Sequence, residues 1–406
     1  MPAPERPAML AGIRVLDFTQ YLAGPTVTRF MAELGADVVK VEQAPGGDPS
    51  RLLPLVKDGR SIYFVQQNRG KRSLCVDFAR PETLELLRRL AAKADVVVEN
   101  YGPGVLEKRG LDYPALRALN PRLVMASLSA YGRTGPLAEK VGFDLMAQAF
   151  SGLMHMTGDP AGPPSWVGLG IGDVGSGVHA FGAIAVALFH RERTGIGQHI
   201  DVSMVDALYH MHEGNVQACA NSDGAIVPIR PGAWHPLAGP MGVYKGPQGW
   251  IALLILDRQW PALLRAMARP ELEHDPRFAT GLLRGQNRAE LAGMIERWTA
   301  TFPSDESLLQ HLEAHRVPAA PVLSVADTLT HPQFLAREMV RKVPDPVLGE
   351  VTIPGFPLKF SELPALPDLR APLLVQHNGE VLREAGYDDA AVHALESKGV
   401  LASGPR

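Results

Sequence analysis

The sequence predicts an α/β protein with a largely parallel sheet that carries helices on both faces, and a second, smaller α+β domain. Three observations predict this fold class. Strand-like and helix-like segments alternate from "IRVLDF" onward. Residues 221–240 break the alternation with proline, glycine and polar residues. The chain has 406 residues, which exceeds the usual size of one domain, so two domains are expected.

The first elements predict a βαβ unit. The segment "IRVLDF" is typical of a buried strand, "PTVTRFMAELG" of a helix that ends at Gly35, and "ADVVKVE" of the next strand. The alternation continues with helix 81–93, strand 94–100, helix 113–120, strand 122–132, helix 173–191 and the segment 198–218. This order predicts parallel strands joined by helices that cover both faces of the sheet.

We place a domain boundary at 221–240, and the part that follows predicts an α+β domain. A hairpin is expected in "GVYKGPQGWIALLIL", followed by helices near 258–268, 286–300 and 304–315. Proline-rich segments after residue 320 lead to a short strand pair near 338–354 and a helix pair from Ala371 to Val400. No repeat of 20 to 50 residues is visible, which excludes a solenoid.

Composition excludes several classes of protein. The net charge is −3 and like charges form no long run, so neither a nucleic-acid arm nor a membrane-surface patch is indicated. Cys75 and Cys219 are the only cysteines, too few for a disulfide framework or a thiolate metal site. The N-terminal segment lacks the pattern of a signal peptide, and the longest apolar run, "AFGAIAVALF", is about half a membrane span. We expect a cytoplasmic protein.

One acidic residue, Asp173, stands among glycines in "GIGDVGSGVHAFGAIAVALF". It is interpretable as the cap of the following helix, because a carboxylate accepts hydrogen bonds from the first free amides. Gly170, Gly172 and Gly175 also match a dinucleotide fingerprint, but no strand precedes them and the carboxylate would repel a pyrophosphate. The third interpretation is a nucleophile, with glycine amides as an oxyanion hole. The local sequence does not decide between the capping and the nucleophile interpretations of Asp173.

Six segments in order resemble the family III CoA-transferases, a group homologous to α-methylacyl-CoA racemase. They are "LAGIRVLDFTQYLAGPTVTRFMAELGADVVKVEQAPGGDPSR", "NRGKRSLCVDFARPE", "ADVVVENYGPGVLEKRGLDYPALRALNPRLVMASLSAYGRTGP", "GFDLMAQAFSGLM", "GDVGSG" and "RTGIGQHIDVSMVDA". The resemblance implies a large Rossmann-like domain built from both chain ends, 1–220 and 330–406, a linker at 221–240 and a small domain at 241–329. It also implies an interlocked homodimer.

The resemblance further implies that Asp173 attacks the acyl-CoA thioester. A mixed anhydride and then an enzyme-CoA thioester would follow, with CoA and acyl-CoA as substrates, no tightly bound cofactor and no metal. The carboxylate is expected to be ionised near neutral pH, and water must be excluded. The residues implied to contact CoA are Val76, Asp77, Phe78, Ala79, Asn100, Tyr101, Lys108, Lys140, Val141 and Phe143, to which we add Arg72 and Arg80 on charge alone.

Several residues bear on the substrate and on the reaction type. Tyr63 matches an active-site tyrosine of formyl-CoA transferase, while Leu22 replaces its glutamine and puts formate or oxalate in doubt. We therefore favour a C4 or C5 dicarboxylic acceptor with succinyl-CoA as donor, and consider Arg230 or His235, in or near a possible gate at 230–240, as carboxylate partners.

The alternative functions are a racemase and a CoA-binding protein without catalysis. The racemase has His where this chain has Phe143, and phenylalanine carries no proton. His155 or His179 as substitutes are more simply packed or surface histidines. The retained Asp173 speaks against a non-catalytic protein. A metal site at "HMHE", residues 210–213, is disfavoured because two histidines one residue apart lie on different sides of a helix.

Overall fold

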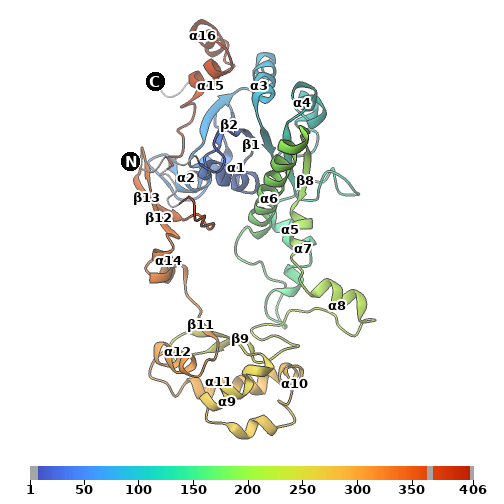
Figure 1. The fold of residues 1–406 in the computed structure, drawn as a ribbon, viewed down its shortest axis with the longest axis vertical. Coiled ribbons are helices and arrows are strands. Elements are labelled where there is room, and N and C mark those ends of the chain that lie inside the picture. The colour runs from blue at the N-terminus through green and yellow to red at the C-terminus, as the bar shows by residue number, and fades with distance from the viewer. Residues whose placement is uncertain (1–7, 364–368, 403–406) are drawn as a thin grey trace. The chain divides into compact units, whose positions relative to one another are not determined.

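The computed structural model describes residues 8–363 and 369–402 and divides them into two compact units. The first unit comprises the described residues within Met1–Leu153, Gly168–Gly214 and Leu335–Arg406. The second comprises Met154–Val167 and Asn215–Phe334. Figure 1 shows the elements of both units.

The first unit is built on a six-stranded sheet in the order β5-β2-β1-β6-β7-β8, in which every neighbouring pair is parallel. The strands are β1 (Arg14–Phe18), β2 (Asp37–Gln43), β5 (Arg72–Val76), β6 (Val96–Glu99), β7 (Val124–Ser129) and β8 (His199–Ser203). The chain adds β2 and β5 on one side of β1 and then crosses to β6 on the other side. The order of strands therefore reverses between β1 and β6, where open parallel sheets bind ligands at the carboxyl ends of the strands.

Helices cover both faces of this sheet, as the alternation predicted. They are α1 (Ala23–Glu33), α3 (Pro81–Lys93), α4 (Tyr113–Leu119), α5 (Asp144–Phe150), α6 (Ile171–Thr194), α7 (Met204–His210), α15 (Asn378–Glu384) and α16 (Asp389–Ser397), while α2 (Ile62–Asn68) packs against β12 and β13. One hydrophobic cluster joins the sheet to α1, α5, α6 and α7, and the other joins it to α3, α4, α15 and α16. Adjacent residues of one strand alternate between them, since Val15 belongs to the first cluster and Leu16 to the second.

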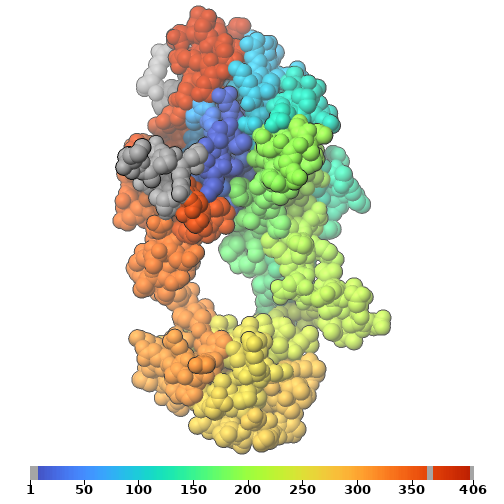
Figure 2. All heavy atoms as spheres, in the orientation of Figure 1, coloured from blue at the N-terminus to red at the C-terminus, as the bar shows by residue number. Residues whose placement is uncertain are grey.

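The two ends of the described chain thus contribute to one core. Val381 and Leu382 of α15 lie in the same cluster as Leu86 and Leu87 of α3. In Figure 2 the carboxyl-terminal residues, in red, lie beside those of α3. Two short antiparallel pairs complete the unit, β3 (Val56–Lys57) with β4 (Arg60–Ser61) and β12 (Val340–Asp345) with β13 (Gly349–Pro354).

The second unit has a three-stranded antiparallel sheet with the order β11-β10-β9. Its strands are β9 (Met241–Lys245), β10 (Trp250–Leu254) and β11 (Ala319–Pro321), and its helices are α8 (Asn215–Asn221), α9 (Trp260–Ala266), α10 (Gly281–Gln286), α11 (Arg288–Thr299), α12 (Asp305–Ala314) and α13 (Val325–Thr328). The short α14 (Pro332–Ala336) spans the border between the units. A core around Trp260, Leu263 and Ile295 joins this sheet to its helices.

The borders of the units differ from the predicted ones. The sequence analysis kept 154–167 in the large domain, whereas this segment belongs to the second unit, where Arg230 donates hydrogen bonds to the carbonyls of His155 and Asp159, both at 3.2 Å. The first unit also ends at Gly214 instead of 220 and resumes at Leu335 instead of 330. A contact between segments distant along the chain leaves no compositional signal, so these borders were not visible in the sequence.

Helix α6 is the one described helix that is long and apolar enough to cross a membrane by length and composition. A core helix of a soluble protein meets the same criterion, and α6 supplies Ala180, Ile184 and Leu188 to the core of the first unit. The finding is therefore weak evidence of insertion. A cytoplasmic location stays a prediction.

Candidate active site

Asp173 is the third residue of α6, within its first turn, and does not cap it. The capping carboxylate is Asp144, the first residue of α5, whose Oδ1 accepts hydrogen bonds from the amides of Gly172 at 2.7 Å and Asp173 at 3.2 Å. The capping interpretation of Asp173 is therefore wrong. No strand precedes Gly170 either, so the fold offers no dinucleotide fingerprint at this turn.

The carboxylate of Asp173 is half-buried and accepts no hydrogen bond from any residue that the structure describes. Burial, and next to it the charge of Asp144, raise its pKa from the ordinary 3.8 to about 7. The expectation of a carboxylate fully ionised at neutral pH needs correction, because about half of the free protein carries the proton at that pH. A carboxylate of raised basicity is also a better nucleophile once ionised.

The glycines around Asp173 allow close packing. A Cβ on Gly170 would lie 2.9 Å from Cδ2 of Leu22, and one on Gly175 would lie 2.9 Å from Cε of Met211. The amide of Gly172 is already bonded to Asp144, so it is not the free oxyanion donor that the sequence suggested. These glycines let neighbouring side chains reach the first turn of α6.

Leu22 and Tyr63 lie near Asp173, as the resemblance implied. Leu22 precedes α1 and meets Gly170, while Tyr63 stands in the first turn of α2. Burial, followed by the charges of Asp173 and Asp48, raises the pKa of Tyr63 to about 12. Its phenol therefore stays protonated and offers an O–H donor within electrostatic range of the Asp173 carboxylate.

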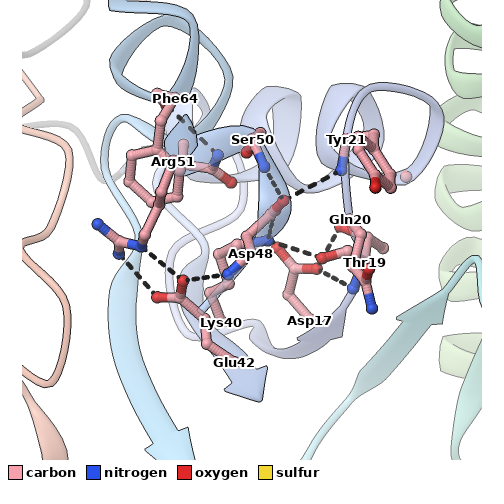
Figure 3. Close-up of polar contacts among 12 residues, drawn as sticks. Asp17, Thr19, Gln20, Tyr21, Lys40, Glu42, Asp48, Ser50, Arg51 and Phe64 are labelled. Carbon is pink, nitrogen blue, oxygen red and sulfur yellow. Dashed lines mark hydrogen bonds and ion pairs between the residues drawn. The ribbon is translucent and has the colours of Figure 1, made fainter. Parts of the chain in front are cut away.

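A buried polar network holds the loop that leads from β1 to Leu22 (Figure 3). Nζ of Lys40 donates to the carbonyl of Thr19 and pairs with Oδ2 of Asp48, both at 2.7 Å. Oδ1 of Asp48 accepts from the amides of Tyr21 at 3.3 Å and Ser50 at 2.8 Å. Tyr21 has a left-handed backbone with φ of 61°, a costly conformation that persists only when its surroundings hold it.

A second buried ion pair completes the network below the loop. Nζ of Lys71 lies 3.0 Å from Oδ2 of Asp17 at the end of β1, and both side chains are fully buried. Burial alone would raise the pKa of Asp17, but Lys71 and Lys40 lower it to about 2. The carboxylate is therefore charged at any physiological pH and accepts hydrogen bonds from Thr19 and Thr28.

The residues expected to contact CoA meet in part at the carboxyl ends of β5 and β6. The rings of Phe78 and Tyr101 pack edge to face at 6.4 Å, and Ala79 and Arg80 are exposed beside Asp77. Lys108, Lys140, Val141 and Phe143 are exposed on following loops. Val76 is buried in the core and its carbonyl accepts a hydrogen bond from the amide of Ala44 at 2.9 Å, so its side chain does not face a ligand.

Two of the expected CoA contacts have other partners. Oδ1 of Asn100 accepts from the amide of Gln20 and its Nδ2 donates to the carbonyl of Gln20, both at 2.8 Å, so this side chain joins the ends of β6 and β1 where the strand order reverses. Arg72 is a correction: it begins β5, at the opposite end from Val76, and pairs with Asp37, Glu380 and Glu384 at 2.6 to 2.8 Å. Charge alone had suggested it, and charge does not tell which end of a strand a residue occupies.

A pocket of about 170 Å³ adjoins Tyr101. It is lined by Tyr101, Pro103, Gly104, Glu107, Ser129, Gly132, Arg133, Ala138 and Glu139. Arg133 pairs with Glu99 and Glu107, and the sequence analysis did not select it. It also missed Asp144, although Asp144 stands directly after the quoted Phe143. A single sequence offers no signal that an acidic residue of one helix caps another.

Arg230, His235 and His179, considered for carboxylate binding or catalysis, have structural partners, and His155 is an exposed surface histidine. Arg230 binds carbonyls of its own unit, and Nδ1 of His235 accepts from the amide of Leu237 at 3.2 Å. The ring of His179 bonds the carbonyl of Gly175 at 2.7 Å. Within residues 8–363 and 369–402, no group of three or more His, Cys, Asp or Glu side chains is arranged to hold a metal ion.

Comparison with known proteins places the chain in a family. The model of CoA-transferase family III matches residues 10–378. The chain belongs to the family III CoA-transferases. The match includes the β1–α1 loop, Tyr63, Asp144 and Asp173, so the whole candidate site lies within it.

Relatives of this CoA-transferase match it over nearly its whole length. A succinyl-CoA:mesaconate CoA-transferase of Haloarcula hispanica is 42% identical over 93% of this chain and 96% of its own. A formyl-CoA:oxalate CoA-transferase of Streptomyces avermitilis is 37% identical over 97% and 99%. A succinate–glutarate CoA-transferase of Agrobacterium fabrum is 36% identical over 94% and 96%.

A solved structure has the same fold. A CAIB/BAIF family protein from Brucella suis superposes with a TM-score of 0.81 and 37% identity, and the match covers 94% of this chain and all of that one. The mixed α/β fold with a large parallel sheet is therefore confirmed, and the enzyme is a CoA-transferase.

Proposed function

We propose that this CoA-transferase moves CoA from succinyl-CoA to a C4 or C5 dicarboxylic acid through covalent intermediates on Asp173. The observation that carries the proposal is a half-buried carboxylate without a hydrogen-bond donor, placed beside Leu22 and Tyr63 at the start of α6. Neither oxygen of Asp173 is among the fully buried atoms that lack a partner, so the carboxylate can be reached from solvent. Its free oxygens are available to an acyl carbon.

The exchange proceeds in balanced steps. An oxygen of ionised Asp173 attacks the thioester carbonyl, the C–S bond breaks, and CoA departs as the thiolate. The acyl group is then held on Asp173 as a mixed anhydride. The thiolate then attacks the Asp173 carbonyl, which releases the donor acid and forms an enzyme-CoA thioester. The acceptor carboxylate attacks this thioester to give a second anhydride, and the returning thiolate takes the new acyl group and frees Asp173. Each step trades one activated acyl bond for another, so no further cofactor is needed.

The choice of substrate is supported by residues and by relatives. Leu22 offers an apolar wall at the position where the resemblance to formyl-CoA transferase implies a glutamine, which suits methylene groups better than oxalate. Two of the relatives described above are named for succinyl-CoA or succinate with a second dicarboxylic acid. The CoA moiety is proposed to lie at the carboxyl ends of β5 and β6, near Phe78 and Tyr101.

A homodimer is part of the proposal. Val174, Val178, Val186 and Phe189 form an apolar stripe on the face of α6 that points away from the core, and they are 37%, 44%, 68% and 64% exposed. A stripe of this kind on a soluble enzyme is expected to be covered by a protein surface. The resemblance implies an interlocked homodimer, and we propose that the second copy of the chain covers this stripe.

The test is CoA transfer by the purified enzyme from succinyl-CoA to a panel of mono- and dicarboxylic acids. Asp173→Asn should abolish transfer and the CoA adduct seen by intact-mass spectrometry, while CoA binding survives. Asp206→Asn, an exposed aspartate of α7, is the matched control and should retain activity. Transfer by Asp173→Asn would refute the nucleophile, and deuterium wash-in at the α-carbon without transfer would indicate a racemase.

A further inference from the structure

Gly170 lies next to both Leu22 and the proposed nucleophile. It precedes the first residue of α6, and a Cβ on it would lie 2.9 Å from Cδ2 of Leu22. The same position lies 3.5 Å from Oδ2 and 3.7 Å from Cβ of Asp173. The apolar end of Leu22 and an oxygen of the Asp173 carboxylate therefore border one small space, and all three residues belong to the first unit.

The backbone at Gly170 does not require glycine. Its φ is −76° and its ψ is 65°, and the amide of Ile171 donates a hydrogen bond to the carbonyl of Leu169 at 2.9 Å. This is an inverse γ-turn, a conformation that residues other than glycine also adopt. Glycine at this position therefore provides the absence of a side chain and no special conformation. A side chain at residue 170 would change the space beside Asp173.

Hydrogen bonds hold both borders of this space. The carbonyl of Leu22 accepts from the amide and from the hydroxyl of Thr26, both at 2.9 Å. On the other border, the buried side-chain amide of Gln148 donates to the carbonyl of Leu169 at 3.0 Å and to Oδ2 of Asp144 at 2.7 Å. Asp144 in turn accepts from the first amides of α6. The folded structure therefore sets the width of the space, and one added methyl group should change it.

We propose that Gly170 and Leu22 set the width of the acyl group that can be attached to Asp173. The acyl carbon bonds an oxygen of that carboxylate, so the first methylene groups of the acyl chain lie within a few bond lengths of it. A carbon 2.9 Å from Cδ2 of Leu22 is closer than van der Waals contact, so a side chain at residue 170 would displace Leu22 or cover Oδ2 of Asp173. This inference rests on the proposed function and names the residues that favour narrow over branched acyl chains.

The first test narrows the space and then widens it. With succinyl-CoA as donor and glutarate as acceptor, Gly170→Ala should lower kcat/KM about tenfold, since one methyl group in a closely fitted pocket has an effect of this order. The apparent pKa of its pH profile should stay close to that of wild type, because no charge near Asp173 changes. Leu22→Ala in the same chain should restore much of the loss. Gly293→Ala, in α11 of the second unit, is the matched control and should keep wild-type activity.

The second test uses Leu22→Ala alone, which does not depend on the folding of Gly170→Ala. It should raise the ratio of kcat/KM for 3-methylglutarate to that for glutarate about tenfold, whereas Gly170→Ala should lower this ratio. A ratio that neither variant changes, or a double variant no more active than Gly170→Ala, would overturn the role of Gly170 and Leu22. A wild-type enzyme that transfers CoA to no acid would instead refute the proposed function.

Discussion

At the scale of single residues, the central feature is a pair of carboxylates at the start of α6. Asp144 accepts the first amides of the helix and thereby replaces Asp173 as its cap. Its charge and the burial of the site keep a proton on Asp173 up to about pH 7. The local sequence could not separate the capping role from the nucleophile role. In the structure the cap is Asp144 of α5 and the proposed nucleophile is Asp173 of α6.

The first prediction concerns the pH dependence of transfer. Because the ionised form of Asp173 attacks, kcat/KM should fall as pH drops below about 7, approaching tenfold per pH unit. Asp144→Asn removes one of the two causes of the raised pKa, so the fall should move to lower pH. The pH profiles of wild type, Asp144→Asn and the control Asp206→Asn test this. Identical apparent pKa values in all three would contradict it.

The second prediction concerns stability. The folded state holds the Asp173 proton up to about pH 7 and the unfolded state only to near 3.8, so this group's contribution to the unfolding free energy decreases as pH rises between these values. Asp173→Asn should therefore stabilise the fold at pH 8, by at most about 4 kcal/mol, and by less at pH 5.5. Urea unfolding at both pH values measures the difference. A loss of stability at pH 8, or an equal gain at both, would be inconsistent with the raised pKa.

At the scale of elements, the approach of α6 to α1 positions the site. A Cβ on Gly177 would lie 2.7 Å from the carbonyl oxygen of Ala23 and 2.8 Å from Cβ of Thr26. Glycine at this point lets the first turn of α6 reach the loop that carries Leu22. The Asn100 amide then joins that loop to the end of β6 across the point where the strand order reverses.

The third prediction tests this close approach with two helical glycines. Gly177→Ala should destabilise the protein by about 1–3 kcal/mol, because α1 and α6 must separate to admit the methyl group. Gly293→Ala in α11 is the matched control, since a Cβ there meets only the end of the Arg297 side chain, at 3.3 Å, and helix propensity favours alanine. Urea unfolding of both variants measures the effect. Equal destabilisation by both would show that the approach of the two helices is not the constraint.

At the scale of the whole molecule, both ends of the described chain build one sheet-centred unit, and the segments Met154–Val167 and Asn215–Phe334 build another. Helix α6 has one face in the core of the first unit and an apolar stripe on the other. The stripe is one exposed apolar feature of this unit that a monomer leaves unexplained.

The fourth prediction tests the proposed dimer. Val186→Asp, alone or with Val178→Asp, places a charge in the stripe and should shift the protein toward monomer in sedimentation velocity, with lower activity, because a buried charge opposes association. Leu119→Asp, an exposed leucine at the end of α4, should remain dimeric. A double variant that stays a dimer would show that another surface holds the two copies together.

The sequence by itself was sufficient for the parallel sheet, its covering helices and the family. Hydrophobic period and turn residues are local properties, so "IRVLDF" and "ADVVVEN" could be recognised as β1 and β6 without knowing their neighbours. The gathering of Leu22, Tyr63 and Asp173 was also predicted, but from resemblance, since they are far apart along the chain.

Only the tertiary structure decided what these residues touch. It showed that Asp144 caps α6, that Asn100 bonds the backbone of Gln20 and that Arg72 lies at the far end of β5. Each of these facts depends on distances between segments that are remote in sequence, and the same distances set burial and charge around Asp173. A sequence pattern carries no such distances. It therefore identified Asp173 as the reactive carboxylate but did not indicate the protonation state of its side chain.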